Sequence, residues 1–189
     1  MRRELSKIVR DLENAQARLD TLTATLSGDL WARRHDPAQW SPAECVAHLN
    51  LTSEAYIPLI RTAIEEARQL PRARSGQYRR DLLGWLFSMM TGPLPSLGRR
   101  RLGRVKTTAA FVPAGAHPRE EVLAQFKRDQ DELIRLVKEA DGLALDQVLI
   151  RSPFGGKIRY NCYSAFVILP RHQDRHLDQA ERVWASPED

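Results

Sequence analysis

The chain has 189 residues, of which 42% are hydrophobic and 28% charged, and its formal net charge is +5. This composition is that of a globular rather than a disordered protein, and the length suits a single domain spanning residues 1–189. Two cysteines without CxxC spacing exclude a disulfide framework, and the longest apolar run is too short to cross a bilayer. Because the charged N-terminus also does not resemble a signal peptide, we expect a cytoplasmic protein with reduced cysteines and no membrane span.

Four long segments carry apolar residues at three- and four-residue spacing with charged residues between them, which is typical of amphipathic helices. These segments are residues 4–26, 42–69, 118–140 and 161–185. The second has the clearest start, because Ser41 is placed as an N-cap, Pro42 occupies the first helical position and Glu44 completes a capping box.

The connection between the second and third helices, at about 70–118, is far longer than a normal helix connection. It is rich in arginine, glycine and proline, and its apolar stretch 81–91 predicts a short helix. We interpret it as a crossover that carries a lid or a partner-binding element, although it could equally only cover one end of the core. Residues 143–160 are expected to form a loop with at most a hairpin-like turn. The predicted fold is all-α, a four-helix bundle with a long crossover insertion.

Three histidines form a candidate site. His172 and His176 lie one turn apart on one face of the fourth helix, and His48 lies at a similar depth in the second. If these two helices pack side by side, the three imidazoles can hold a metal that keeps an open coordination position. Nitrogen ligands alone suit zinc, nickel, iron or copper. Spacing also allows His48 to be a hydrogen-bonded core residue and the other two to lie on the surface. The remaining histidines, His35 and His117, are expected to be solvated.

Two motifs carry a resemblance to a known family. They are Trp-Ser-Pro-Ala-Glu-Cys-Val-Ala-His-Leu at 40–49 and His-Gln-Asp-Arg-His-Leu-Asp-Gln at 172–179. With their order along the chain, they resemble the DinB-like family, which includes YfiT-like metal-dependent hydrolases and bacterial thiol-dependent S-transferases. The resemblance covers nearly the whole chain, and the segment 70–118 fits least. It implies that the metal ligands are His48, His172 and His176.

The chain departs from the family pattern at two places that are not ligands. Arg175 stands where members often have a histidine, and Asp178 stands where a glycine is frequent, so the substrate class stays open. Asp174 and Asp178 could accept a hydrogen bond from an imidazole. We favour the alternative that they pair with arginines of the same helix, namely Arg171, Arg175 or Arg182.

The resemblance implies a metal-dependent enzyme that uses a divalent transition metal, such as zinc, nickel or iron, on a small-molecule substrate. The reaction would be hydrolysis, or transfer of a low-molecular-weight thiol to an electrophile. The alternative is a non-catalytic, stress-related or dimerising interaction module, with the apolar helix at 82–90 as a homodimer face.

Much of the positive charge lies in the insertion, where it could attract an anionic substrate or thiol. The residues concerned are Arg72, Arg74, Arg79, Arg80, Arg99, Arg100, Arg101 and Arg104. The few aromatic residues of this segment are not interleaved with the arginines, so nucleic-acid binding is not favoured.

Overall fold

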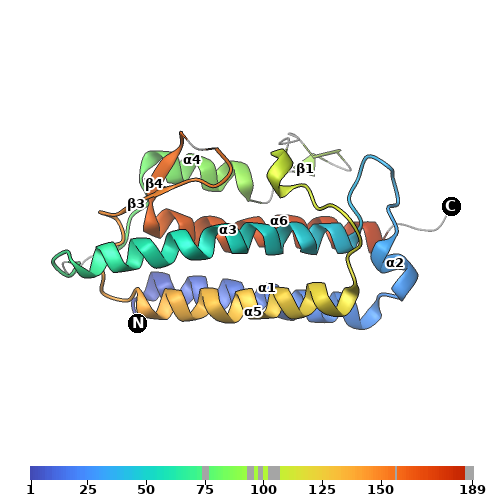
Figure 1. Ribbon diagram of the computed structural model, residues 1–189, viewed down its shortest axis with the longest axis horizontal. Helices are drawn as coiled ribbons and strands as arrows, with labels where there is room; N and C mark the ends of the chain where they lie inside the picture. Colours follow the sequence, from blue (N-terminus) through green and yellow to red (C-terminus); the bar gives the residue numbers. More distant parts are fainter. Residues whose placement is uncertain (74–76, 93–95, 98–99, 102–106, 156, 186–189) are drawn as a thin grey trace.

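A computed structural model describes residues 1–73, 77–92, 96–97, 100–101, 107–155 and 157–185. Its four long helices lie side by side along the long axis of the molecule (Figure 1). They are α1 (Arg3–Thr25), α3 (Pro42–Arg68), α5 (Arg119–Glu139) and α6 (Cys162–Ala185). Around the bundle, α3 contacts α5 and α6, and α1 contacts the same two helices. The predicted all-α bundle is therefore confirmed.

Short elements fill the connections. A helix, α2 (Gly28–Ala32), follows α1, and the insertion carries α4 (Leu82–Thr91) and a 3₁₀ helix, η1 (Ala109–Phe111). Two antiparallel strand pairs are present: β1 (Ser96–Leu97) with β2 (Arg100–Arg101), and β3 (Leu149–Arg151) with β4 (Arg159–Asn161). Arg74, Arg99 and Arg104 of the predicted basic segment lie outside the described residues, and no side chain is described for Arg100 or Arg101.

The capping box at the start of α3 forms as its sequence predicts. Ser41 Oγ accepts a hydrogen bond from Glu44 N at 3.2 Å, and Ser41 N donates to Glu44 Oε2 at 2.9 Å. Two otherwise unpaired donors are satisfied, which fixes where the helix begins. The position of His48, one turn further along α3, is set by this start.

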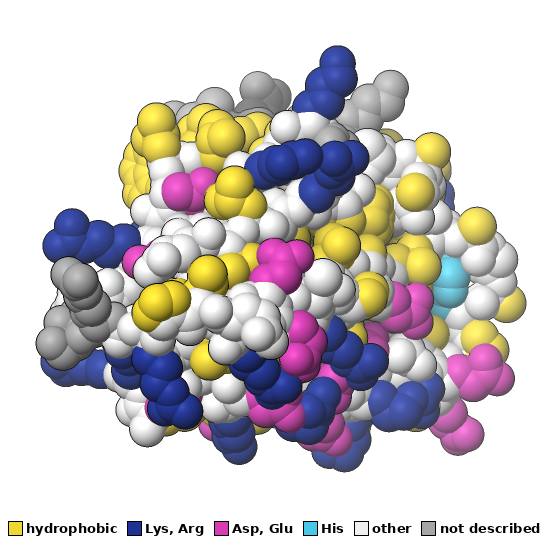
Figure 2. All heavy atoms as spheres, turned by 60° about the vertical axis from the view of Figure 1, so that its left-hand side comes forward, with side chains coloured by type: hydrophobic (Ala, Val, Ile, Leu, Met, Phe, Trp, Pro, Cys, Tyr) yellow, Lys and Arg dark blue, Asp and Glu magenta, His cyan; other side chains and the backbone are white. Residues whose placement is uncertain are grey.

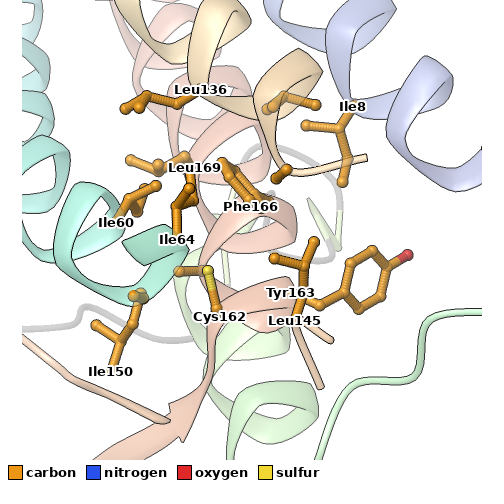
Figure 3. Close-up of a cluster of buried hydrophobic side chains, with 14 of the residues drawn as sticks. Ile8, Ile60, Ile64, Leu136, Leu145, Ile150, Cys162, Tyr163, Phe166 and Leu169 are labelled. Atoms are coloured by element: carbon orange, nitrogen blue, oxygen red, sulfur yellow. The ribbon is translucent and has the colours of Figure 1, made fainter. Parts of the chain in front are cut away.

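The apolar stripes of the long helices meet in the core, and part of the largest cluster is drawn in Figure 3. Phe166 of α6 is about 1% exposed and lies among Ile60 and Ile64 of α3 and Leu136 of α5 (Figure 3). A second apolar cluster, which includes Trp31 of α2, occupies the other end of the bundle. Both cysteines are buried and free, as expected.

A polar pair is buried in the bundle. Gln130 of α5 donates from Nε2 to Leu12 O at 2.9 Å and to Gln173 Oε1 at 3.1 Å. Gln173 of α6 returns a hydrogen bond from its own Nε2 to Gln130 Oε1 at 2.8 Å. These reciprocal amide bonds join α1, α5 and α6, and they fix the face of α6 on which the neighbouring His172 lies.

The insertion helix α4 packs closely on α6 (Figure 1). Asp81 caps α4 by accepting from Gly84 N at 3.2 Å, and the same carboxylate oxygen accepts from Ser164 Oγ of α6 at 2.9 Å. Gly84 is buried, and a Cβ atom there would overlap the Ser164 side chain. Only a residue without a side chain permits this approach.

Two arginines of α6 hold the other end of α4. Arg171 Nε donates to Ser88 O at 3.0 Å, and Arg175 Nη1 donates to Met90 O at 2.9 Å. Ser88 O also accepts from Gly92 N at 3.3 Å. Because the carbonyl end of a helix carries partial negative charge, cationic donors stabilise it. Tertiary contacts thus seat α4 over one end of the bundle.

The outer face of α4 remains open to solvent. Leu82 is 79% exposed, and five further apolar residues of α4 are 46–50% exposed, namely Leu83, Trp85, Leu86, Met89 and Met90. Hydrophobic side chains gather near the top of the molecule, the side on which α4 lies, whereas charges of both signs mix below (Figures 1 and 2). None of the helices in the described part of the chain is long and apolar enough to cross a membrane.

Candidate metal centre

The three candidate imidazoles converge where α3 packs against α6. His48 Nε2 lies 3.3 Å from His172 Nε2, and one ring nitrogen from each of His48, His172 and His176 lies within 4.8 Å of the other two. The ring centroids are 4.5–5.0 Å apart. Side-by-side packing of the second and fourth long helices, the condition for a three-histidine site, is therefore met.

All three histidines are buried, with exposed fractions of 2%, 6% and 7% for His48, His172 and His176. Trp40 covers one side, with its ring 4.9 Å from that of His48 and stacked 5.8 Å from that of His176. Phe154 of the β3–β4 connection lies 5.7 Å from the His172 ring. The alternative that His172 and His176 lie on the surface is therefore wrong.

The backbone fixes the tautomer of His48. Its Nδ1 lies 2.7 Å from Phe111 O. A carbonyl oxygen can only accept, so Nδ1 carries the proton and Nε2 of the neutral ring presents its lone pair to the other imidazoles. A ligand histidine in metal sites is commonly oriented by such a bond to its other nitrogen.

Burial sets the charge of the cluster. Desolvation lowers the pKa of His48 to about 4, although the bond to Phe111 O acts in the opposite direction. Desolvation also holds the pKa values of His172 and His176 well below the ordinary value, and the neighbouring imidazoles and Arg175 add to this. At neutral pH the three rings are therefore uncharged, which is the form that binds a metal.

The residues fit a metal ion. Nδ1 of His172 and Nδ1 of His176 are buried and have no hydrogen-bond partner among the residues that the structure describes. On His172 the nitrogen that faces His48 is Nε2, so a metal between these two rings would be bound by Nε2 and would leave Nδ1 as the hydrogen-bonding nitrogen. Three neutral imidazoles match the nitrogen donors that divalent transition metals accept, and they do not select one metal.

A cavity of about 180 Å³ opens beside the imidazoles. Three residues of α4, Phe87, Met90 and Thr91, form part of its wall, together with Phe154 and Arg175. The insertion thus covers the site and also exposes apolar residues to solvent, and Met90 does both, since it lines the cavity and is 46% exposed. A larger, open groove of about 820 Å³ between α3 and α5 contains none of the three histidines.

Two acidic residues near the site have a partner that sequence reasoning missed. Arg18 of α1 contacts Asp174 at 3.1 Å, Asp178 at 2.8 Å and Glu181 at 2.8 Å, all three on α6. The four charges link α1 to α6. No local pattern pairs residues more than 150 positions apart in the chain, so only the packing of the helices reveals this cluster.

The other candidate residues lie apart from the site. His35 is exposed, as expected, whereas His117 is half-buried and lines the larger groove. Among the described insertion arginines, Arg72, Arg79 and Arg80 do not line the cavity, and Arg80 Nη1 instead donates to Ser88 Oγ at 2.7 Å. The arginine that does reach the cavity is Arg175 of α6.

Comparison with known proteins identifies the family. Searches of curated proteins and of solved structures each found no significant match. The family model described as the DinB superfamily matches residues 11–180, which is most of the chain. The chain therefore belongs to the DinB superfamily.

Proposed function

We propose that the protein is a metal-dependent enzyme in which His48, His172 and His176 hold a divalent transition metal and a small electrophilic substrate enters the adjacent cavity. The observation that carries this proposal is the meeting of three buried, neutral imidazoles beside an open cavity. Three protein ligands and access for a small molecule characterise catalytic metal sites, whereas structural sites are closed by a fourth ligand.

The surrounding residues prepare the site for this role. Phe111 O orients the His48 ring, and Trp40 and Phe154 exclude water from two sides of the cluster. A divalent metal held there would supply Lewis-acid activation of a thiol or of water. The protein would contribute fixed ligand geometry and a shaped cavity.

Thiol transfer is favoured over hydrolysis by the composition of the cavity wall. Among the described lining residues there is no aspartate or glutamate that could take a proton from water. A thiol, with an ordinary pKa of about 8.5, needs much less help to ionise than water does. We therefore propose a low-molecular-weight thiol as co-substrate and treat hydrolysis as the competing reaction.

Paired activity assays test the proposal. Zinc- or nickel-loaded protein is assayed with cysteine and monochlorobimane for thiol transfer, and with p-nitrophenyl acetate for hydrolysis. The expected result is a metal-dependent rate above the spontaneous reaction in the first assay, lost in His172→Ala/His176→Ala. The matched control is His35→Ala/His117→Ala, which should retain the rate. Equal rates in wild-type protein and the His172→Ala/His176→Ala variant in both assays would contradict an enzymatic role.

The exposed face of α4 supports a second candidate function, an interaction module that forms a homodimer. Six apolar residues on one short helix, each 46–79% exposed, make a contiguous surface of the kind that marks protein–protein interfaces. A two-fold axis through α4 would bury this face against its copy. This role does not require catalysis, although both roles could coexist because the inner face of α4 lines the cavity.

The molecular mass in solution tests the homodimer. Light scattering after size-exclusion chromatography should give a dimer for wild-type protein and a monomer for Leu86→Glu, because a charge cannot be buried in an apolar interface without cost. Val112, which is 44% exposed on another segment, offers a matched control, and Val112→Glu should leave the dimer intact. A monomeric wild-type protein at high concentration rules the homodimer out.

A further inference from the structure

One charged side chain, that of Arg175, lies among the described residues lining the cavity beside the three histidines. The neutral imidazoles form one wall. The remaining lining is apolar or hydroxylic and consists of Phe87, Met90, Thr91, Thr107, Thr108 and Phe154. Among these described residues, the wall therefore combines a single permanent positive charge with an otherwise uncharged surface.

The position of Arg175 is fixed by the fold. It directly precedes His176 on α6, and its Nη1 donates to Met90 O of α4 at 2.9 Å. Since Met90 also lines the cavity, this bond holds the guanidinium at the wall next to the imidazoles. A planar guanidinium offers several N–H donors in a fork that matches a carboxylate or another oxyanion.

The acidic residues nearest in sequence lie outside this cavity. Asp174 and Asp178 of α6 contact Arg18 of α1 and do not belong to the described lining. A divalent metal on the histidines would add further positive charge. Because opposite charges attract, a cavity with this positive charge in its wall favours a ligand that carries negative charge.

The volume of the cavity and its other lining residues indicate which class of ligand it can hold. About 180 Å³ is below the 300–1,000 Å³ or so that typically holds a drug-sized ligand, so a small molecule fits. The rings of Phe87 and Phe154 and the Met90 side chain offer apolar and aromatic contacts to its body.

We propose that the cavity selects small organic anions, with an oxyanion group such as a carboxylate at Arg175 and an apolar or aromatic body against Phe87 and Phe154. Arg175 is then a specificity-determining residue. The inference rests on the proposed function, since it names the class of electrophile that the metal site would act on, yet the charge recognition itself does not require the metal.

Calorimetric titration with two probes of nearly equal shape tests the inference. Benzoate carries the anionic group, and benzamide is its neutral counterpart. Both are titrated into zinc-loaded and metal-free protein, into Arg175→Gln, and into Arg171→Gln as a matched control. Arg171 lies one turn earlier on α6 and also donates to a carbonyl of α4, but it does not line the cavity.

Benzoate is expected to bind wild-type protein at least about tenfold more tightly than benzamide. This affinity ratio corresponds to the contribution of a hydrogen bond to a charged group. Arg175→Gln should remove this preference and leave benzamide affinity unchanged, whereas Arg171→Gln should retain it. An equal loss for both probes, an unchanged preference in Arg175→Gln, or no benzoate binding would overturn the inference. If no zinc binds, the proposed function fails, and the metal-free titrations still decide the role of Arg175 by the same criteria.

Discussion

The backbone of Gly84 in α4 lies so close to Ser164 in α6 that a Cβ atom at position 84 would overlap the serine hydroxyl. Asp81 caps α4 and accepts from Ser164 Oγ at the same point. This contact seats the insertion helix over the bundle, and through Phe87, Met90 and Thr91 it completes the wall of the cavity.

Replacing Gly84 by alanine should destabilise the protein. In an exposed helix interior the same change would add about 1 kcal/mol of stability, because alanine is the better helix former. Here the new methyl group overlaps Ser164, and overpacking of this kind costs about 1–3 kcal/mol. Urea denaturation measures the difference. Gly28→Ala serves as the control, because a Cβ atom at position 28 meets nothing within 4 Å, and a stabilised Gly84→Ala variant would contradict the proposed seating of α4.

Mutations of the buried pair Gln130 and Gln173 should have non-additive effects on the free energy of unfolding. Gln173→Leu alone should lower the free energy of unfolding by about 1–3 kcal/mol, because Gln130 loses both of its hydrogen bonds to the partner amide in the core. Gln130→Leu/Gln173→Leu should recover much of this loss, since no amide is then left unpaired. Denaturant titrations of the two single mutants and the double mutant give the coupling energy. Strictly additive losses would show that the pair does not act as a unit.

Replacing the buried carboxylate of Asp129 in α5 should stabilise the protein, and the gain in stability should depend on pH. Burial raises the pKa of Asp129 to about 6 from its ordinary value of 3.8, despite a hydrogen bond from Gln125 Nε2. Its Oδ2 has no partner among the described residues. The folded state thus binds the proton more tightly than the unfolded state. The stability contributed by this proton is complete below pH 3.8 and is lost as the pH rises through 6.

The stability of Asp129→Asn relative to wild-type protein should therefore increase between pH 4 and pH 8, by up to about 3 kcal/mol. Unfolding is measured for both proteins at each pH, so that other titrating groups cancel. Asp131→Asn on the same helix is a matched control for the loss of a carboxylate, because the Asp131 side chain is 68% exposed. A difference for Asp129→Asn that stays constant with pH would mean that the carboxylate is not desolvated.

Local patterns explain how much of the fold could be predicted. The start of α3 follows from Ser41, Pro42 and Glu44, and the period of the apolar residues predicts all four long helices to within about two residues. The strand pair β3–β4 lies within residues 143–160, for which the sequence predicts a loop with at most a hairpin-like turn. Its strand β3 contacts α3 and α6, and such contacts have no signature in the local sequence.

Local sequence likewise predicts some features of the candidate metal centre and not others. Helical spacing places His172 beside His176, and the depth of His48 in the second long helix, together with the family motif, adds His48. The bond from His48 to Phe111 O spans 63 residues, and the contacts of Arg18 with α6 span still more, so neither has a local signature. Arg175 is visible in the sequence as a departure from the family pattern, but only the packing of α4 shows that it lines the cavity.

The central claim is that His48, His172 and His176 hold a metal, and its most direct test is elemental analysis of untagged protein purified without chelator. We predict about one transition-metal ion per chain in wild-type protein and in the control His35→Ala/His117→Ala, and almost none in His172→Ala/His176→Ala. Wild-type protein without metal, and without thermal stabilisation when zinc or nickel is added, would contradict the claim, as would full metal content in His172→Ala/His176→Ala.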